Sequence, residues 1–233
     1  AERAAVRLGS DVFSQGAIAP SGLAGACNAL RRFVGSMRSV GVERYRAVAT
    51  SAVREAENAE VFIDRARREA GIEIEVVSGL EEARLIHLGV LQAVPVFDRR
   101  LLLCDIGGGS TELIIGEKFE PRHLASLRMG CVSISRHCFG NGRVTAGRLR
   151  EAELLVQLNL EPVREEYLAR GWEVVTGASG SIKALQDVVV SEGWCREGIS
   201  LDALRRLLDV EHQPMNALEE RVERPAQLAD LVG

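Results

Sequence analysis

The feature that most restricts the fold of this chain is an apolar stretch that runs into three consecutive glycines. Residues 101–106 are apolar except for Asp105, and residues 107–109 are all glycine. A short apolar run bounded by glycines predicts a buried β-strand that ends in a turn. The apolar residues 113–115 follow and predict the antiparallel partner of a hairpin. The predicted strand therefore delivers an aspartate to a glycine turn.

Helical and strand patterns alternate along the rest of the chain. Helices are predicted over 20–40, 58–70, 78–94, 145–170 and from 181 onward. Strands are predicted over 45–50, 72–77, 101–106, 113–115 and 172–176. This alternation indicates an α/β fold, with a change of structural unit along the helix at 78–94.

The composition excludes several classes of protein. Of the 233 residues, 46% are hydrophobic and 27% are charged, which is typical of a globular protein. There is no run of about 18 apolar residues, which a membrane helix would require. A net charge of -4 creates no positive field that would attract DNA or anionic lipid. Five cysteines without a CxxC pair favour reduced thiols. We therefore expect a cytoplasmic protein without DNA or membrane partners.

The glycine turn predicts a phosphate site. A hairpin alone needs only two turn residues, whereas Gly107, Gly108 and Gly109 allow positive φ and close backbone approach. Several N–H groups can then converge on an anion. Ser110 and Thr111 add hydroxyl donors. The alternative is a flexible hairpin turn with no ligand.

Two carboxylates flank this turn. Asp105 precedes the glycines and Glu112 follows them. Mg²⁺ is commonly held by one or two carboxylates together with substrate phosphate oxygens. The sequence therefore predicts a magnesium ion, carried by Asp105 and Glu112, beside the phosphate site.

A second phosphate element is predicted where the strand at 172–176 passes through a loop of small residues, 177–180, into a helix. Helix N-termini attract phosphate. A lysine in the first turn of that helix is disfavoured by the helix dipole unless an anion lies near. The candidate contacts are Gly177, Ser179, Gly180 and Lys183. An ordinary structural turn is the alternative.

Two charged residues complete the candidate site. Ser78 and Glu81 match a capping box, in which Ser78 caps the helix and Glu81 reaches back to it. Glu82 is rotated about 100° further round the helix and is left to act as a general base. Arg54 follows a predicted strand and its turn, where it can hold an oxyanion. Each of the two is otherwise an ordinary surface residue.

Three segments, in this order and spacing, resemble the exopolyphosphatase and guanosine pentaphosphate phosphohydrolase (Ppx/GppA) family: 77–85, 105–113 and 177–183. The similarity extends over nearly the whole chain. It implies an actin-like, ribonuclease-H-like ATPase fold with two α/β domains, over 1–83 and 84–233, and an active site in the cleft between them. It also implies that the family's first phosphate loop and its C-terminal part lie outside these residues. Residues 8–11 imitate that loop but lack a hydrophobic strand before them.

The resemblance also implies a reaction and a role for each candidate. The reaction is magnesium-dependent release of terminal phosphate from polyphosphate or guanosine pentaphosphate (pppGpp). Glu82 matches the catalytic glutamate, Asp105 and Glu112 the Mg²⁺-associated carboxylates, and Arg54 a phosphate-contacting arginine. The phosphate loop corresponds to 107–111, and the 177–180 loop to a second glycine-rich binding element. Members of the family are often dimeric, so a homodimer is one option, and the sequence leaves the oligomeric state open.

Two other functions stay open from the sequence. One is an actin-like module that binds polyphosphate or a phosphorylated nucleotide without hydrolysing it. The other is a kinase of the same superfamily, which would need an acceptor pocket. Three carboxylates favour the hydrolase, because a polyanion binder gains nothing from them unless a metal is used. The sequence does not choose between polyphosphate and pppGpp.

Overall fold

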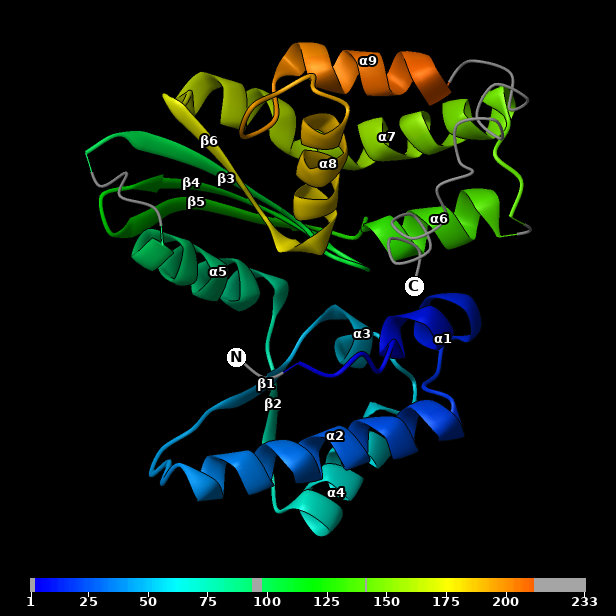
Figure 1. Ribbon diagram of the computed structural model, residues 1–233, viewed down its shortest axis with the longest axis vertical. Helices are drawn as coiled ribbons and strands as arrows, with labels where there is room; N and C mark the ends of the chain where they lie inside the picture. The colour runs from blue at the N-terminus through cyan, green and yellow to red at the C-terminus, as the bar shows by residue number, and fades with distance from the viewer. Residues whose placement is uncertain (1–2, 94–97, 141, 212–233) are drawn as a thin grey trace.

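The computed structural model describes residues 3–93, 98–140 and 142–211, which are arranged as a smaller N-terminal unit and a larger unit (Figure 1). The smaller unit contains α1 (Leu8–Gln15), α2 (Pro20–Ser39), β1 (Ala47–Ala49), α3 (Ser51–Arg54), α4 (Ala59–Ala70) and β2 (Ile74–Val76). The larger unit contains α5 (Gly79–Ala93), β3 (Arg100–Ile106), β4 (Thr111–Glu117), β5 (Glu120–Leu127), α6 (Cys131–Phe139), α7 (Ala146–Arg170), β6 (Val174–Ala178), α8 (Ser179–Ser191) and α9 (Leu201–Glu211).

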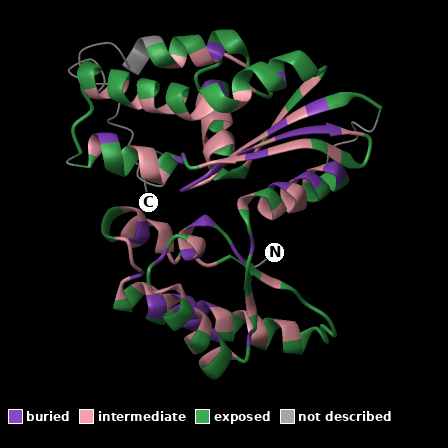
Figure 2. Ribbon diagram, turned by 180° about the vertical axis from the view of Figure 1, so that it is seen from behind, coloured by how far each residue is buried: buried purple, intermediate pink, exposed green. Residues whose placement is uncertain are grey.

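The smaller unit is built on two short parallel strands. Ala47 of β1 pairs with Ile74 of β2. The apolar stripe of α2 and the buried Phe62 of α4 form a cluster with β1 and α3. Gly71 ends α4 in the left-handed conformation, with φ 68°, where glycine carries no Cβ penalty. Buried residues, purple in Figure 2, line this interior.

The larger unit is built on a four-stranded sheet in the order β5-β4-β3-β6. β3 is antiparallel to β4 and parallel to β6, and β4 is antiparallel to β5. α5 lies on one face of the sheet, and α7 and α8 lie on the other (Figure 1). On β3, Leu101 and Leu103 are buried with α5, whereas Leu102 packs on the cluster that contains Tyr167 of α7. Because both faces are covered, the strand is continuously apolar.

All five predicted strands and the five predicted helices are present, with boundaries that differ by a few residues. Five elements had no prediction: α1, α3, β5, α6 and α9. The predicted loop at 177–180 is wrong. β6 continues to Ala178 and α8 begins at Ser179, because Ser179 itself turns the chain with φ 78°.

The proposed division between residues 83 and 84 falls inside α5, and it stays a prediction. Residues 8–11 form the first turn of α1, in agreement with our rejection of this segment as a phosphate loop. None of the helices in the described parts of the chain combines the length and the apolar character needed to cross a membrane.

Candidate functional site

Four residues that are directly paired across the strands form a row near one end of the larger sheet. Asp105 of β3 is paired with Glu112 of β4 on one side and with Ala178 of β6 on the other. Glu112 is paired in turn with Ser126 of β5. Directly paired residues point to the same face of a sheet. We call Ser126, Glu112, Asp105 and Ala178 the cross-strand row. It lies on the α5 face, because Asp105 is two residues after Leu103, which packs against α5, and alternate residues of a strand point to the same face.

The first turn of α5 brings Glu82 to this face. The N–H of Glu81 donates to Oγ of Ser78 at 3.2 Å, which confirms the predicted cap. The second half of the predicted capping box is wrong. The carboxylate of Glu81 instead accepts hydrogen bonds from Arg84 at 2.7 and 2.8 Å and faces Arg46, and these bonds lower its pKa to about 2. Glu82 therefore remains available to the row.

Glu112 is the most deeply buried acid of the site, with 1% of its surface exposed. Burial raises its pKa to about 7, and the charges of Glu82 and Asp105 add to this rise. Hydrogen bonds from Ser126 and Ser110 act in the opposite direction. Oγ of Ser126 donates to Oε1 of Glu112 at 2.8 Å. Three carboxylates thus converge on one small region, and their charges oppose one another.

Asp105 is held at the end of β3 by the start of α8. Burial raises its pKa, a hydrogen bond from Ser179 opposes the rise, and the charge of Glu82 adds to it. The Ser179 Oγ also lies 2.6 Å from the carbonyl oxygen of Ile106, so its single proton is shared between these two acceptors. Ser179 has a positive φ of 78°, which is uncommon for a residue other than glycine. The sharp turn at Ser179 therefore places its hydroxyl beside the aspartate.

The carboxylates are chemically suited to a divalent cation. Hard cations prefer oxygen ligands, and Mg²⁺ needs only one or two carboxylates when phosphate and water complete its shell. A cation beside Asp105 and Glu112 would relieve the repulsion that raises their pKa values. In the part of the chain that the structure describes, no three metal-ligating side chains form a closed metal centre. A magnesium role for this pair stays a prediction.

Arg54 is brought together with Glu82, whereas its contact with a phosphate oxygen stays a prediction. Its Nη1 donates to Oε2 of Glu82 at 3.1 Å and to the carbonyl of Val77 at 2.9 Å. The Glu82 side chain is 14% exposed and the Arg54 side chain 25% exposed, so both still reach solvent. Glu82 borders a cleft of about 360 Å³. Its lining residues are Val48, Thr50, Val77, Glu82, Leu85, Ile86 and Asp105.

The triple glycine is used for close packing rather than for unusual backbone angles. None of the residues 107–109 has a positive φ. Positive φ was one of the two properties of glycine from which the phosphate site was predicted, so that part of the argument is wrong. A Cβ on Gly109 would collide with the ring of Phe13 in α1 and with the hydroxyl of Ser51 in α3. The smaller unit therefore packs directly on the glycine turn.

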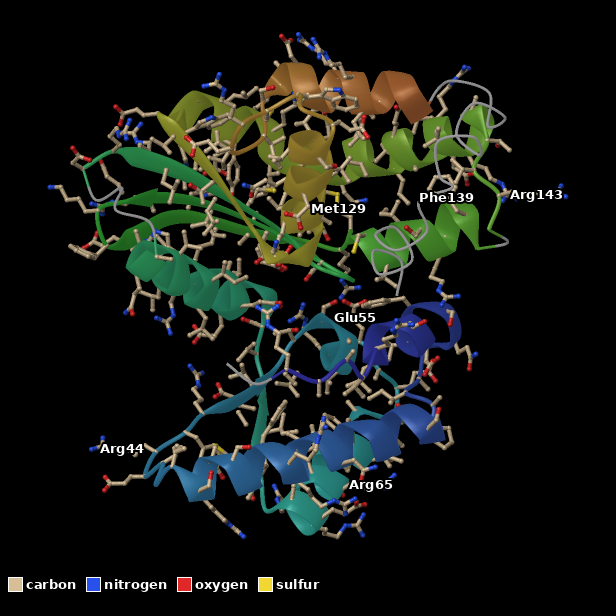
Figure 3. The ribbon with its side chains drawn as sticks, viewed as in Figure 1. Arg44, Glu55, Arg65, Met129, Phe139 and Arg143 are labelled. Atoms are coloured by element: carbon tan, nitrogen blue, oxygen red, sulfur yellow. The ribbon has the colours of Figure 1, made fainter. Side chains whose placement is uncertain are left out.

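The carbonyls of the glycine turn cap α6. The Gly107 and Gly108 carbonyls accept hydrogen bonds, at 2.9 to 3.0 Å, from the N–H groups of Cys131, Val132 and Ser133. Gly130 lies against the turn, because an added Cβ would be 2.5 Å from the Gly109 nitrogen. Met129, labelled in Figure 3, leads from β5 into this capped helix. The N-terminus of α6 and Gly130 thus fix the position of the glycine turn, and its contact with phosphate stays a prediction.

The two hydroxyls after the glycines are buried and have partners within the protein. Thr111 Oγ1 donates to the carbonyl of Met129 at 2.6 Å. The Ser110 hydroxyl hydrogen-bonds to Glu112. Both residues are at most 5% exposed. These contacts hold the turn and the buried acid, whereas direct phosphate contact by either hydroxyl stays a prediction.

The second glycine-rich element is divided by the structure. Gly177 lies in β6 against a side chain of α8, and the space around Gly180 is open. Lys183 is not brought to the carboxylates. Its Nζ pairs with Asp187 at 3.0 Å, and its side chain is 73% exposed. Of the predicted contacts in this element, only Ser179 is partnered with an acid of the cross-strand row, Asp105, and phosphate binding by the four stays a prediction.

Sequence reasoning missed several residues that support the site. Ser126 lies on β5, a strand that was not predicted because its first half is polar and contains Pro121. Gly130, Phe13 and Ser51 hold the glycine turn through contacts between distant segments, which no local pattern encodes. The one available signal was that the similarity to the family extends over nearly the whole chain, including the stretch around Gly130.

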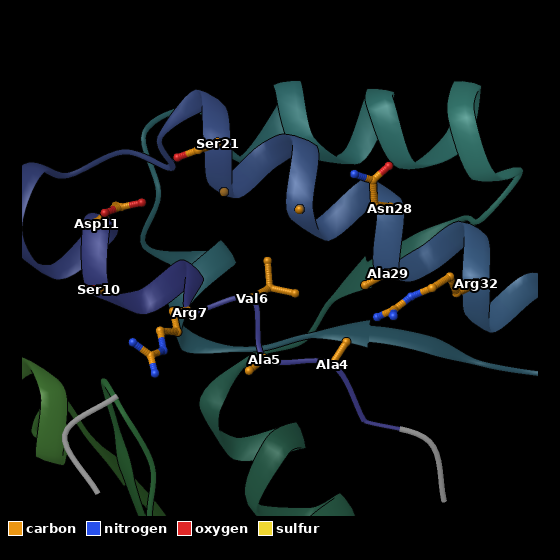
Figure 4. Close-up of a pocket in the computed structure, with 12 residues that line it drawn as sticks. Ala4, Ala5, Val6, Arg7, Ser10, Asp11, Ser21, Asn28, Ala29 and Arg32 are labelled. Atoms are coloured by element: carbon orange, nitrogen blue, oxygen red, sulfur yellow. The ribbon is translucent and has the colours of Figure 1, made fainter. Parts of the chain in front are cut away.

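A second, larger cavity of about 440 Å³ lies in the smaller unit (Figure 4). It is bordered by residues 4–7, α1 and α2, and it contains none of the predicted site residues. Its charged lining residues are Arg7, Asp11 and Arg32.

Comparisons with known proteins agree with the geometry. The Ppx/GppA phosphatase family model matches residues 1–221. The chain is 36% identical over 202 residues to the guanosine-5'-triphosphate,3'-diphosphate pyrophosphatase of Photobacterium profundum. It is 38% identical over 202 residues to the corresponding Vibrio cholerae protein. Each match covers 87% of this chain and 40% of the relative. The chain thus spans about two fifths of the length of these relatives.

Solved structures show the same architecture. An exopolyphosphatase from Cytophaga hutchinsonii superposes with a TM-score of 0.81 at 28% identity, covering 99% of this chain and 76% of that protein. A Ppx/GppA protein from Aquifex aeolicus superposes with a TM-score of 0.72 at 24% identity, covering 95% and 72%. The actin-like α/β fold expected from the sequence is thereby confirmed.

Proposed function

The chain belongs to the Ppx/GppA phosphatase family, and from this premise we propose that it forms the catalytic cleft of a phosphohydrolase acting on terminal phosphates. The proposed substrates are inorganic polyphosphate and guanosine pentaphosphate, because the relatives carry the names of exopolyphosphatases and of guanosine pentaphosphate pyrophosphatases. One observation carries the proposal: Glu82 of α5 faces Asp105 and Glu112 of the sheet beside a cleft that also contains Asp105.

In the proposed reaction, water attacks the terminal phosphoryl group in line with the bond that breaks. Glu82 orients the water or accepts its proton. Arg54 holds the Glu82 carboxylate through Nη1, and a guanidinium has further N–H donors for a phosphate oxygen. Asp105 and Glu112 would hold Mg²⁺, which when bound neutralises charge that develops on the phosphoryl oxygens. Most of the rate enhancement in such reactions comes from positioning and electrostatics.

The proposal is tested by replacing Glu82 in the intact protein and measuring phosphate release from polyphosphate and pppGpp with Mg²⁺. General base catalysis contributes about 10²–10⁴-fold. Glu82→Gln should lower kcat by that factor while binding, measured by calorimetry, changes little. Glu81→Gln is the matched control, because Glu81 is adjacent but pairs with Arg84 and Arg46 outside the cleft. Near-normal turnover in Glu82→Gln would remove Glu82 from this role.

The alternative, a non-catalytic module that binds the same polyanions, gives a different outcome in this experiment. Calorimetry would then show binding of polyphosphate or pppGpp, while the wild-type protein would release no phosphate. The opposing charges of three acids favour the enzyme, because they weaken polyanion binding unless a cation is present.

A further inference from the structure

The first residue of α5 lies directly against the cross-strand row. A Cβ added to Gly79 would lie 2.5 Å from the Cβ of Ser126, and closer still to its hydroxyl. Rotation of the hydroxyl would leave the clash with the Ser126 Cβ, so the helix or the strand would have to move. Glycine at position 79 therefore allows the first turn of α5 to lie as near to β5 as it does.

Ser126 also holds one of the acids of the site. Its hydroxyl donates to Glu112 at 2.8 Å, and the two residues are direct cross-strand neighbours. Nη2 of Arg54 would lie 3.9 Å from a Cβ on Gly79. The contact between Gly79 and Ser126 is thus made at the edge of the group formed by Arg54, Glu82 and Glu112.

Glu82 follows Gly79 by three residues, which is about one helical turn. Residues at this spacing lie on the same side of a helix. A displacement of the first turn away from the sheet therefore moves Glu82 away from Asp105 and Glu112. The backbone N–H of Glu82 is tied to the carbonyl of Ser78 at 2.9 Å, so Glu82 moves with that turn.

We propose that the contact between Gly79 and Ser126 is a positioning device, which fixes the height of the first turn of α5 above the cross-strand row and thereby the distance of Glu82 from the other two acids. This inference rests on the proposed function, because it explains the close contact by the need to place Glu82 for catalysis. Ser126 and Gly79 act through Glu82, so both are positioning residues.

The size of the effect follows from the clash. Ordinary carbon contacts need about 3.5–4 Å, so a methyl group on Gly79 requires a shift of about 1 Å. A misplacement of about 1 Å costs on the order of 10²-fold in rate. Gly79→Ala should therefore lower kcat by about 10²-fold and change KM little. Gly89→Ala on the same helix is the matched control, because a Cβ there has nothing within 4 Å.

The decisive comparison is made in the intact protein with four further variants. Ser126→Gly removes both clashing atoms, so the double variant Gly79→Ala/Ser126→Gly should be as active as Ser126→Gly alone. In a Glu82→Gln background, Gly79→Ala should lower the residual activity no further. A merely structural defect would lower activity in both backgrounds. The inference would be overturned if the double variant lost activity by the product of the two single losses, or if Gly79→Ala had wild-type activity.

Urea unfolding followed by circular dichroism separates this inference from the proposed function. Gly79→Ala should lower the unfolding midpoint, and Ser126→Gly should cancel that decrease in the double variant, whether or not the protein is an enzyme. Absence of such coupling would overturn the contact itself. Absence of phosphate release by the wild-type protein, with coupling present, would overturn the proposed function and with it the role of Glu82.

Discussion

His87 is predicted to make the stability of this protein depend on pH between 5.5 and 7.5. It lies on α5, is 0% exposed, and packs against Gly116 of β4. In the described part of the chain, neither ring nitrogen has a hydrogen-bond partner. Burial lowers its pKa from 6.5. Burial without a partner disfavours the charged imidazolium in the folded protein.

The sign and the magnitude follow from proton linkage. The unfolded chain binds a proton at His87 near pH 6.5, and the folded protein binds it only at lower pH. Stability is therefore fully present above pH 6.5 and is lost as the pH falls from 6.5 towards the folded pKa. The loss at pH 5.5 is at most RT ln(1 + 10), or about 1.4 kcal/mol, which is the limit in which the folded protein binds no proton at His87.

His87→Leu tests this reasoning by urea unfolding at pH 7.5 and 5.5. The variant should lose the contribution of His87 to the pH dependence, which is up to about 1.4 kcal/mol at pH 5.5. It should also be more stable at pH 7.5 by about 1–3 kcal/mol, because an unsatisfied polar group is no longer buried. His137→Leu is the control for loss of a histidine, since His137 is exposed on α6. Equal pH dependence in wild type and His87→Leu would refute the argument.

Three further predictions concern the site. Glu112→Gln should raise the stability of the protein at pH 8 by up to about 3 kcal/mol, and by less at pH 6. The reason is that a carboxyl group whose pKa is raised to about 7 on folding makes the folded protein less stable as the pH rises from 4.5 through 7. Urea midpoints at the two pH values measure this, and equal gains would contradict it. Gly130→Ala should destabilise the fold by more than about 2 kcal/mol, because its Cβ would lie 2.5 Å from the backbone of the glycine turn; a thermal midpoint within about 2 °C of wild type would show that the turn yields. Lys183→Ala should leave the affinity for polyphosphate and pppGpp within about twofold, because the exposed Lys183 pairs with Asp187; a tenfold weakening by calorimetry would assign Lys183 to the phosphate site.

The sequence was sufficient for the elements whose residues face a core on a regular period. The continuous apolar run of β3 reflects burial on both faces of the sheet, with Leu103 towards α5 and Leu102 towards α7. The chain also placed Asp105 and Glu112 symmetrically about the glycine turn, so the hairpin register had to pair them. For these two acids, the spacing in the sequence was therefore enough to predict that they lie side by side on the sheet.

Other features depend on contacts that local patterns do not contain. The glycines at 107–109 suggested freedom of φ, but their conformations are ordinary, and the constraint at Gly109 comes from Phe13 and Ser51. Ser179 was assigned to a loop of small residues, and nothing in the sequence indicated its positive φ, which is uncommon at a residue other than glycine. The surrounding fold outweighs that local preference.

The donors around the acids indicate how the site tolerates their mutual repulsion. Each acid has at least one donor from a different element: Arg54 of α3 for Glu82, Ser126 of β5 for Glu112, and Ser179 of α8 for Asp105. Hydrogen bonds to the charged form lower a pKa and offset part of the effect of burial. The offset is incomplete, because the pKa values of both sheet acids remain raised. The donors therefore fix where each carboxylate lies, and the unbalanced negative charge is what a divalent cation with a phosphate substrate would satisfy.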